Sequence, residues 1–272
     1  MPEFIVANEA MLRTGSFAAL FVLIACSEWC WPRRVLAFSR PRRWQNHLCL
    51  AVINTLLMRI LFPMAAVGAA LLAQDAGWGL FTVLGTPDAI AIPVAFLLLD
   101  VVVYGQHRAM HALPLLWRVH RVHHADLDLD ITSGLRFHPI EMILSMAIKV
   151  AVVFLVGAPV LAVLIFEIVL NGTSLFNHAN LRLAGPVDRV IRWIVVTPDM
   201  HRVHHSVSLN ESNSNFGFNL PWWDHIFHSY RAVPSAGHEQ MCLGLSTLRD
   251  VDDCTGLVAM LVLPFRRITD RF

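Results

Sequence analysis

Residues 142–170, MILSMAIKVAVVFLVGAPVLAVLIFEIVL, decide the fold of this chain. The stretch is apolar enough to enter a bilayer, and one upright helical span needs about 20 such residues. The Gly-Ala-Pro triplet at residues 157–159 lies at its middle, where a helix is expected to break or turn. The stretch therefore holds either one kinked span or two short limbs that enter and return.

We expect the hairpin, from Pro139 to about Leu181, either as two short spans or as a re-entrant pair. Non-helical backbone at its tip would need protein or water around it. Lys149 in one limb and Glu167 in the other would then lie at comparable depth and could pair. A single kinked span is the alternative, and it would place the segments before and after it on opposite sides of the membrane.

The same five residues, HRVHH, stand on both sides of this stretch, at residues 120–124 and again at 201–205. Their flanking sequences share nothing convincing, so a duplicated domain does not explain the repetition. A hairpin returns the chain to the side from which it left and so allows both pentads to share one site. The repeated histidines must then be explained by local chemistry.

The composition is that of a membrane protein. The chain has 272 residues, of which 56% are hydrophobic, and its mean hydropathy is +0.56. A net charge of +1 provides no broad field for nucleic acid. The five cysteines are scattered without a C-x-x-C pair, which favours neither a disulfide framework nor a zinc-thiolate site. Any metal chemistry therefore belongs to histidine.

Three further apolar stretches precede the first pentad. We expect spans at Ser16–Trp31, Leu48–Ala73 and Ile90–Tyr104, and no cleavable signal peptide is apparent before them. Arg59 falls inside the second span, where it is expected to snorkel, pair or face a cavity. The predicted fold is an all-α, polytopic transmembrane bundle of about four spans, the last of them either one kinked span or the short or re-entrant hairpin.

The arginines predict the orientation of this bundle. Residues 74–85, between the second and third spans, contain no Lys or Arg, whereas the linker after the first span is rich in arginine: Arg33, Arg34, Arg40, Arg42 and Arg43. Because basic loops stay in the cytoplasm, the first linker and the region after Tyr104 are expected there. The histidines would then lie in a cytoplasmic helical cap.

The histidine spacing predicts a metal site. His107 and His111 are four residues apart, and each pentad places its histidines at i, i+3 and i+4, so each cluster lies on one helix face. An isolated pair of this kind is more often solvated or a helix cap. Three clusters at one end of a bundle hold eight imidazoles, which is too many for one tetrahedral ion and suits a dinuclear centre.

Ligand type does not select among Zn, Cu, Fe and Ni. There is no H-E-x-x-H motif of a zinc hydrolase, and a structural zinc needs only four ligands. Many nitrogens around two ions at the mouth of an apolar bundle fit a di-iron centre that oxidises a lipid C–H bond, chemistry that acid–base side chains cannot supply. The alternatives are a metal-ion transporter or metal-binding protein, which would hold ligands near mid-membrane, and a haem protein with histidines inside the spans.

The ordered motifs HRAMH, WRVHRVHH, RFHPIE, FNHANL, TPDMHRVHH and NFGFNLPWWDHIF resemble the fatty acid hydroxylase/sterol desaturase superfamily of integral membrane di-iron enzymes. The resemblance covers about Asp100 to Tyr230. It implies two iron ions, which zinc can replace during purification, with O2 as co-substrate and a lipid that is hydroxylated or desaturated. Because no cytochrome b5-like segment is fused to the chain, it also implies a separate electron donor, a ferredoxin or a cytochrome b5-like protein with its reductase.

The resemblance carries over a set of metal ligands: His107, His111, His120, His123, His124, His178, His201, His204 and His205. His138 in RFHPIE also falls on a family position, although a histidine before a proline at the start of a helix can be structural. Nearby acceptors are expected to fix the imidazole tautomers; the candidates are Asp100, Glu141, Asn180, Asp199 and Asp224. His225 and His228 depart from the family pattern and are assigned to the surface or cap, while His47 and His238 are treated as ordinary residues.

The expected organisation is a single membrane domain over residues 1–272. Residues 1–99 hold the N-terminal spans, 100–230 the hydroxylase-like catalytic region, and 231–272 a cytoplasmic tail in which Gly256–Phe265 is too short to span. The expected partners are the bilayer, a lipid substrate and the electron donor, and no nucleic acid. Arg182, Arg189 and Arg192 suit either the donor or anionic headgroups.

Overall fold

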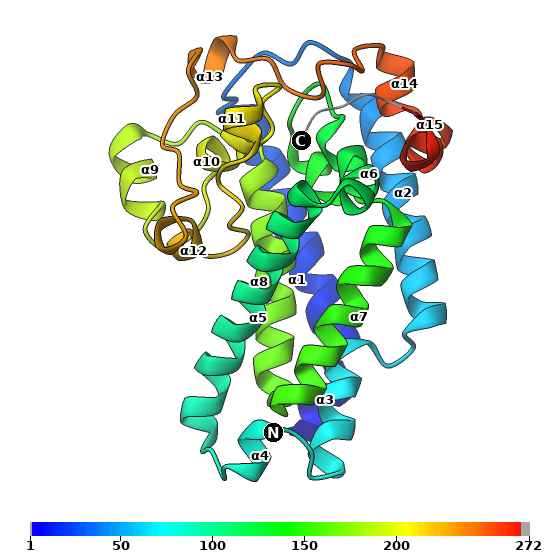
Figure 1. Ribbon diagram of the computed structural model, residues 1–272, viewed down its shortest axis with the longest axis vertical. Coiled ribbons are helices and arrows are strands. Elements are labelled where there is room, and N and C mark those ends of the chain that lie inside the picture. Colours follow the sequence, from blue (N-terminus) through cyan, green and yellow to red (C-terminus); the bar gives the residue numbers. More distant parts are fainter. Residues whose placement is uncertain (1, 268–272) are drawn as a thin grey trace.

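The computed structural model describes residues 2–267 (Figure 1). Within that range every regular element is a helix, and only isolated bridges occur in place of a sheet. The elements of the spanning part are α1 (Pro2–Cys30), α2 (Arg40–Leu61), α3 (Ala65–Asp75), α4 (Leu80–Val83), α5 (Asp88–Ala112), α7 (Pro139–Val156) and α8 (Val160–His178). Those of the head are α6 (Pro114–His124), η1 (Ile131–Leu135), α9 (Gly185–Ile191), α10 (Pro198–His204), α11 (Leu209–Ser212), α12 (Trp222–Ile226), α13 (Gly237–Gln240), α14 (Val251–Thr255), α15 (Leu257–Val262) and η2 (Leu263–Phe265).

Five segments of the described part of the chain are long and apolar enough to cross a membrane: Ala7–Cys30, Arg40–Val83, Asp88–Ala112, Pro139–Val156 and Val160–His178. Helices α1, α5 and α8 run toward the end that carries α6 and α10, while α2 and α7 run away from it (Figure 1). Both HRVHH pentads therefore lie at the same end of the bundle. The all-α, multi-span prediction is confirmed.

The hairpin prediction is also confirmed, and the single kinked span is wrong. Helix α7 ends where Gly157 adopts a left-handed conformation (φ 66°), which favours glycine, and Pro159 precedes α8. The tip packs against Gly79 so closely that a Cβ on either glycine would meet backbone atoms of the other segment. Lys149 Nζ lies 2.8 Å from Glu167 Oε1, so the expected pair between the two limbs is formed.

The second span differs from the prediction. The sequence favours one helix over Leu48–Ala73, but α2 ends at Leu61 and α3 begins at Ala65, after a break that contains Pro63. Proline disrupts the helix, and Ala65 takes a positive φ of 47° at the restart. Arg59 lies exposed in the last turn of α2, close to the end of that span.

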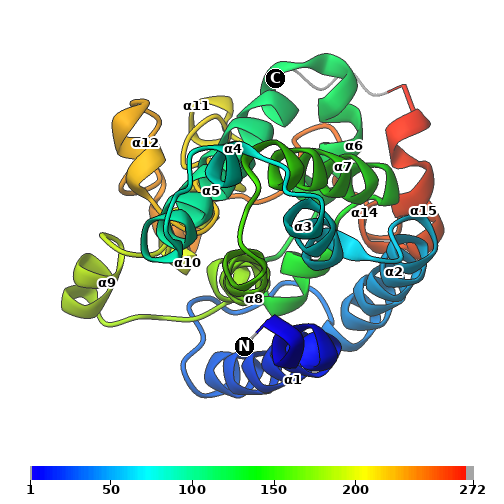
Figure 2. The same cartoon turned by 90° about the horizontal axis from the view of Figure 1, so that it is seen from below.

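Helix α8 is the centre of the bundle, with α1, α3, α5 and α7 around it (Figure 2). Small residues of α3 and α5 allow close approach, and alanines such as Ala69 and Ala95 are buried against apolar side chains of α7 and α8. The rings of Phe96 and Phe166 meet edge to face at 5.4 Å between α5 and α8. This packing fixes the upper ends of α5 and α8, where metal-ligand candidates lie.

A buried arginine–aspartate network joins the head to the bundle. Arg43 near the start of α2 contacts Asp126 (Nη2–Oδ2 2.9 Å) and Asp130 (Nη1–Oδ2 2.6 Å), and Arg136 lies 3.6 Å from Asp126. All four side chains are almost completely buried. The guanidinium of Arg43 contributes most to holding the pKa of Asp126 well below its usual range against the opposing effect of burial.

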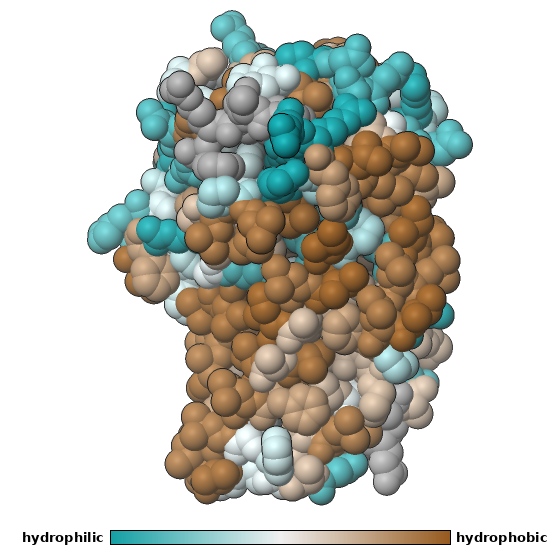
Figure 3. All heavy atoms as spheres, turned by 45° about the vertical axis from the view of Figure 1, so that its right-hand side comes forward, coloured by the Kyte–Doolittle hydropathy of each residue, from teal (hydrophilic) through white to brown (hydrophobic). Residues whose placement is uncertain are grey.

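The apolar surface forms a broad belt around the spanning part, and hydrophilic residues gather on the head (Figure 3). Residues 257–265, expected to be too short to span, form α15 and η2 in the head. Met260 and Leu263 are buried there, and Arg121 donates to the Leu263 carbonyl from α6 (2.8 Å). The part of the expected tail after residue 267 lies outside the described residues.

Candidate metal centre

The histidine motifs converge where four helices meet. HRAMH forms the last turns of α5, and Pro114 starts α6 after a single extended residue, so the chain bends and returns the first pentad over the bundle. His178 ends α8, and Pro198 begins the short helix α10 that carries the second pentad. Proline is compatible with the first turn of a helix, because its missing N–H would have no partner there.

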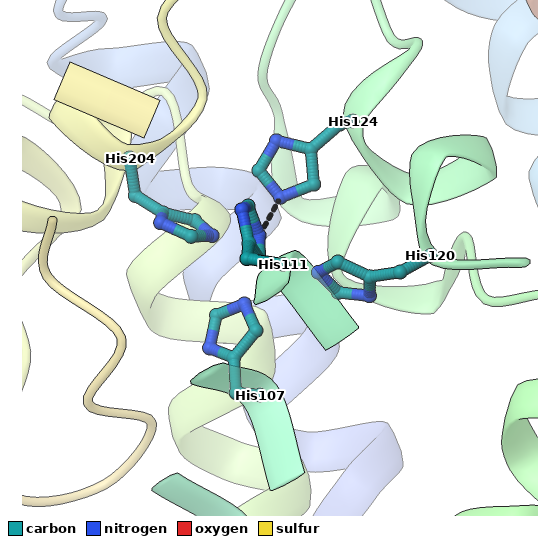
Figure 4. Close-up of side chains that lie close together, drawn as sticks. All are labelled: His107, His111, His120, His124 and His204. Carbon is teal, nitrogen blue, oxygen red and sulfur yellow. Dashed lines mark hydrogen bonds between the residues drawn. The ribbon is translucent and has the colours of Figure 1, made fainter. Parts of the chain in front are cut away.

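The structure brings nine histidines together in two adjoining groups. The first histidine group comprises His107, His111, His120, His124 and His204 (Figure 4). The second histidine group comprises His123, His178, His201 and His205. Within each group, one nitrogen from every ring lies within 4.8 Å of the others, and all nine residues are buried. Each pentad contributes to both groups, so the two groups share helices α6 and α10.

The Nε2 atoms of the second histidine group are spaced like neighbouring ligands of one ion. His178 Nε2 lies 3.0 Å from the Nε2 atoms of both His123 and His201, and His205 Nε2 lies 3.2 Å from that of His201. Ligands at right angles around an ion with metal–nitrogen bonds of about 2.1 Å would be about 3.0 Å apart. The residues present therefore fit a metal ion.

The first histidine group presents unpartnered nitrogens to a common centre. Among the described residues, the Nε2 atoms of His107, His120 and His204 are buried without a hydrogen-bond partner. The other nitrogen of each ring is occupied, since Nδ1 lies 2.8 Å from the Phe216 carbonyl in His107 and 2.7 Å from Glu141 in His120. Because carbonyl and carboxylate oxygens accept, Nδ1 carries the proton and Nε2 keeps the lone pair that a metal binds.

Two more backbone carbonyls fix imidazoles in the same way. His204 Nδ1 donates to the Ser214 carbonyl (2.8 Å), and His178 Nδ1 donates to the Ser174 carbonyl (2.7 Å). A metal-binding histidine usually donates its second ring N–H to such an acceptor. The tautomer needed for Nε2 ligation is thus set before any ion binds in three rings of the first histidine group and in His178 of the second.

Burial favours the neutral form of His124, His201 and His204. It lowers the pKa of His204 to about 3, with the neighbouring His120 ring adding to the effect. Burial and then the nearest imidazole also lower the pKa of His124 and of His201 well below the ordinary value. Metal ligation requires neutral imidazole, so the protein holds the donors in the form that binds cations.

His138 is not part of either group. It precedes α7 as its N-cap, where Nδ1 accepts from the Ile140 N–H (3.2 Å), and its Nε2 donates to the Leu261 carbonyl (3.2 Å). Both ring nitrogens are therefore occupied away from the nine clustered rings. The structure gives His138 a capping position at the start of the hairpin.

Of the five acceptors expected beside the ligands, Glu141 alone bonds a clustered histidine within the described residues. Asp224 acts one step away: it accepts from the N–H groups of Phe216 and Gly217 (both 2.8 Å), which fixes the turn whose carbonyl meets His107. Asp100 accepts from Trp223 Nε1 (2.7 Å) and so anchors α12 to α5.

Asn180 and Asp199 brace the linker between α1 and α2. Asn180 exchanges two hydrogen bonds with the backbone of Arg34, accepting at 3.0 Å and donating at 2.8 Å. Asp199 pairs with Arg33 (3.2 Å) and with Arg202. These residues hold α8 and α10 in place through the arginine-rich linker and bond no clustered imidazole directly.

Sequence reasoning missed several participants. The backbone carbonyl acceptors of Phe216, Ser174 and Ser214 could not be predicted from residue type, because every residue has a backbone carbonyl. His47, treated as ordinary, is fully buried beside the arginine–aspartate network and bonds Thr132 Oγ1 (2.9 Å). The alternating aspartates of the ADLDLD run after the first pentad were the available signal for that network.

His225, His228 and His238 lie outside both groups. His225 and His228 are exposed, in agreement with a surface or cap position, and the ring of His225 stacks on Tyr230 (4.2 Å between centroids). His238 is mostly buried near Asp199, with 3.6 Å between Nε2 and Oδ2. None of these rings contributes to the metal-ligand candidates.

Comparison with known proteins identifies the family. The model of the fatty acid hydroxylase family matches residues 92–229, a region that contains all nine clustered histidines. Ornithine lipid hydroxylase OlsE of Rhizobium tropici is 29% identical over 182 residues, which cover 66% of this chain and 52% of that protein. Alkylglycerol monooxygenase of Xenopus tropicalis is 30% identical over 158 residues, which cover 56% of this chain and 32% of that protein.

Very-long-chain aldehyde decarbonylase GL1-6 of Oryza sativa subsp. indica is more distant, at 23% identity over 197 residues, with 70% of this chain and 28% of that protein covered. The chain thus spans about half or less of the length of these curated relatives. No solved structure matches it. The family match extends over half of the chain and includes the whole histidine centre, so this protein belongs to the fatty acid hydroxylase family.

Proposed function

We propose that this protein is a membrane-bound di-iron oxygenase that uses O2 and externally supplied electrons to hydroxylate or desaturate an alkyl C–H bond of a lipid. One observation carries the proposal: two adjoining groups of buried imidazoles converge at one end of an apolar bundle. The names of the relatives, a lipid hydroxylase and a monooxygenase among them, favour iron and O2 over a non-redox metal.

The first histidine group would hold one ion and the second histidine group the other. When bound, the two ions would supply the activation of O2 and the electron transfer that amino-acid side chains cannot provide. The chain's own contribution is the orientation of the donors. Glu141 holds the proton of His120 on Nδ1, and the Phe216 carbonyl does the same for His107, which leaves both Nε2 lone pairs free for ligation.

Burial of the nine histidines also limits the access of water to this centre. Aromatic rings line it: Phe137 stacks on His123 at 4.3 Å between centroids, and Phe216 meets His111 at 5.2 Å. Exclusion of water strengthens electrostatic interactions inside the site and limits side reactions of an oxidising centre. The position suits an alkyl chain that stays in the bilayer while one of its carbons reaches the histidines.

The substrate class we propose is a membrane lipid with a saturated alkyl segment. The clustered histidines lie at the ends of α5 and α8 and on α6 and α10. They do not lie at mid-membrane, where a transporter holds its ion. The arginine-rich linker between α1 and α2 is at the same end as these histidines (Figure 1). By the positive-inside rule the centre faces the cytoplasm, from which a separate ferredoxin or cytochrome b5-like donor would deliver electrons.

Lipid analysis of membranes tests this function. Cells that express the chain should accumulate lipids that have gained one oxygen or lost two hydrogens, and the triple variant His120→Ala/His123→Ala/His124→Ala should lack them. His228→Asn is the matched control, because it removes an exposed histidine and keeps a residue that tolerates the positive φ of that position. Oxidised lipid from the triple variant at the unsubstituted level would overturn the proposal.

A further inference from the structure

Helix α9 and the turn that follows it carry an apolar stripe that nothing in the described chain covers. Val187 and Val190 are three residues apart and share one face of α9, and Ile194 follows in the turn after the helix. They are 48%, 64% and 64% exposed. A stripe of this kind normally faces a core, and large exposed apolar patches mark an interaction surface.

Helix α12 continues this surface. Trp222, Ile226 and Phe227 are 43%, 58% and 45% exposed. The indole N–H of Trp222 donates to the Trp193 carbonyl (2.7 Å), which ties α12 to the segment after α9. We call Val187, Val190, Ile194, Trp222, Ile226 and Phe227 the α9–α12 shelf.

The contacts of α12 fix the depth of the shelf. Trp223 Nε1 donates to Asp100 of α5 (2.7 Å), and the ring of Phe227 stacks on Tyr104 at 5.3 Å between centroids. Asp100 and Tyr104 precede His107 by about two turns and one turn of a spanning helix, or about 10 and 5 Å along its axis. Figure 1 accordingly shows α12 beside α5, below α10. The α12 part of the shelf thus lies on the membrane side of the metal-ligand candidates, and α9 lies beside α10 (Figure 1).

The charges around the shelf suit a lipid surface. Arg189 is an exposed side chain of α9 beside the apolar residues. The exposed Arg182 precedes the helix and pairs with Glu239 (2.7 Å). Arginine beside exposed tryptophan is the usual composition of a membrane interface, where the ring lies at headgroup level and the guanidinium meets phosphates.

We propose that the α9–α12 shelf is embedded in the headgroup and upper acyl region of the leaflet nearest the histidine centre. Its occupant is the phospholipid of the bilayer, and its apolar residues continue the lipid-facing surface of α5. The head is therefore held at the membrane by the shelf as well as by the spans. Asp224 of α12 connects the shelf to the turn that orients His107, so lipid contact supports the geometry of the centre.

Photo-crosslinking in the full-length protein tests the shelf independently of metal content and activity. The photoreactive residue p-benzoylphenylalanine would replace Val190 or Ile226, and the protein would be reconstituted in vesicles of phosphatidylcholine and phosphatidylglycerol. Leu155, an exposed residue of the spanning helix α7, is the lipid-facing control, and Gln240 of α13 at the top of the head is the aqueous control.

After irradiation, we expect intact-mass spectra with a phospholipid adduct at residues 190 and 226, as at 155, and none at 240. Val187 on the same stripe replaces either position if a variant fails to fold. The proposal is overturned if residues 190 and 226 behave like 240, or if they crosslink to a second copy of the chain or to another protein. Failure of the shelf would leave the oxygenase proposal standing, since that proposal is judged by lipid products.

Discussion

Two buried polar clusters lie side by side in the head, and they differ in how their charges are balanced. The arginine–aspartate network carries its own cations: Arg43 and Arg136 lie beside Asp126 and Asp130. The two histidine groups instead bring together the ligand nitrogens of nine buried imidazoles, a set of donors that a metal ion would complete. His124 and Asp126 are only two positions apart. His124 belongs to a cluster proposed to bind an added metal ion, whereas Asp126 belongs to a cluster whose charges are balanced by arginines of the chain.

The largest effect that this comparison predicts is on activity. His201→Ala should reduce lipid oxidation to background, because it removes one of the four donors of the second histidine group. The melting temperature of the metal-free variant should stay close to that of the metal-free parent, since no charged partner is left behind. Product analysis and calorimetry measure both quantities. A variant that retains activity would remove His201 from the proposed ligands.

A substitution in the arginine–aspartate network should instead reduce the stability of the fold. Asp126→Asn leaves two buried guanidinium groups without their shared carboxylate, which costs about 3–5 kcal/mol of unfolding free energy and lowers the melting temperature by roughly 10 °C. Asp128→Asn is the matched control: the Asp128 carboxylate accepts a backbone bond from Phe38 (2.9 Å), and an amide oxygen can replace it. Equal destabilisation by both substitutions would contradict the assignment of Asp126 as the centre of the network.

Acidification of the metal-free protein should change the stability contributed by the two clusters in different pH ranges. The folded-state pKa of His204 is lowered to about 3, so between pH 6.5 and 3 the unfolded chain binds a proton that the folded chain does not. Stability from this residue is complete above pH 6.5 and falls with acidification, by about 2 kcal/mol at pH 5.

The lowered pKa of Asp126 has the opposite meaning, because for a carboxyl group a lowered pKa favours the charged form. Because that carboxyl is held below its usual range, its contribution persists down to about pH 4 and is lost only below it. Denaturation curves of metal-free protein at pH 7 and pH 5 test this, with His204→Gln as the variant in which the slope should decrease. Stability that does not change between these two pH values would contradict the burial of neutral histidines.

The substitution Glu141→Gln is expected to have a smaller effect, a reduction in metal affinity. The amide oxygen can still accept from His120 Nδ1, but the charge that strengthens this hydrogen bond is lost. Metal affinity should fall by about 10–100-fold, as is usual for residues that orient a ligand. Titration of iron or zinc into the metal-free protein measures the change. Asp75→Asn is the control: it removes an exposed carboxylate at the end of α3, in the spanning part, and should leave affinity unchanged.

The sequence predicted the hairpin and the convergence of the pentads because both depend on local signals. Gly157 and Pro159 interrupt an apolar run, and histidine spacing of three and four residues fixes a helix face. The break at Pro63 was missed because the surrounding residues are apolar enough for one long span. Arg43 meets Asp126 from a distant part of the chain, and a single sequence contains no record of such a contact.

The site was predictable to the extent that side chains define it. Eight of the clustered histidines were identified by residue type and spacing, and His178 by the resemblance to the family. Their division into two groups depends on tertiary geometry: His123 and His124 are neighbours but belong to different groups. Of the acceptors chosen by residue type, Glu141 reaches an imidazole, while Asp199 is used by Arg33 and Arg202. Carbonyl acceptors such as that of Ser214 are a property of the fold alone.

Metal counting in variants tests the central claim most directly. Protein loaded with iron in the absence of O2 should hold two ions per chain, His107→Ala/His204→Ala should retain one in the second histidine group, and His178→Ala/His201→Ala should retain one in the first. Both double variants should lose product formation. A parent protein that saturates at a single ion, or a double variant that still binds two, would contradict the division of these histidines into two metal sites.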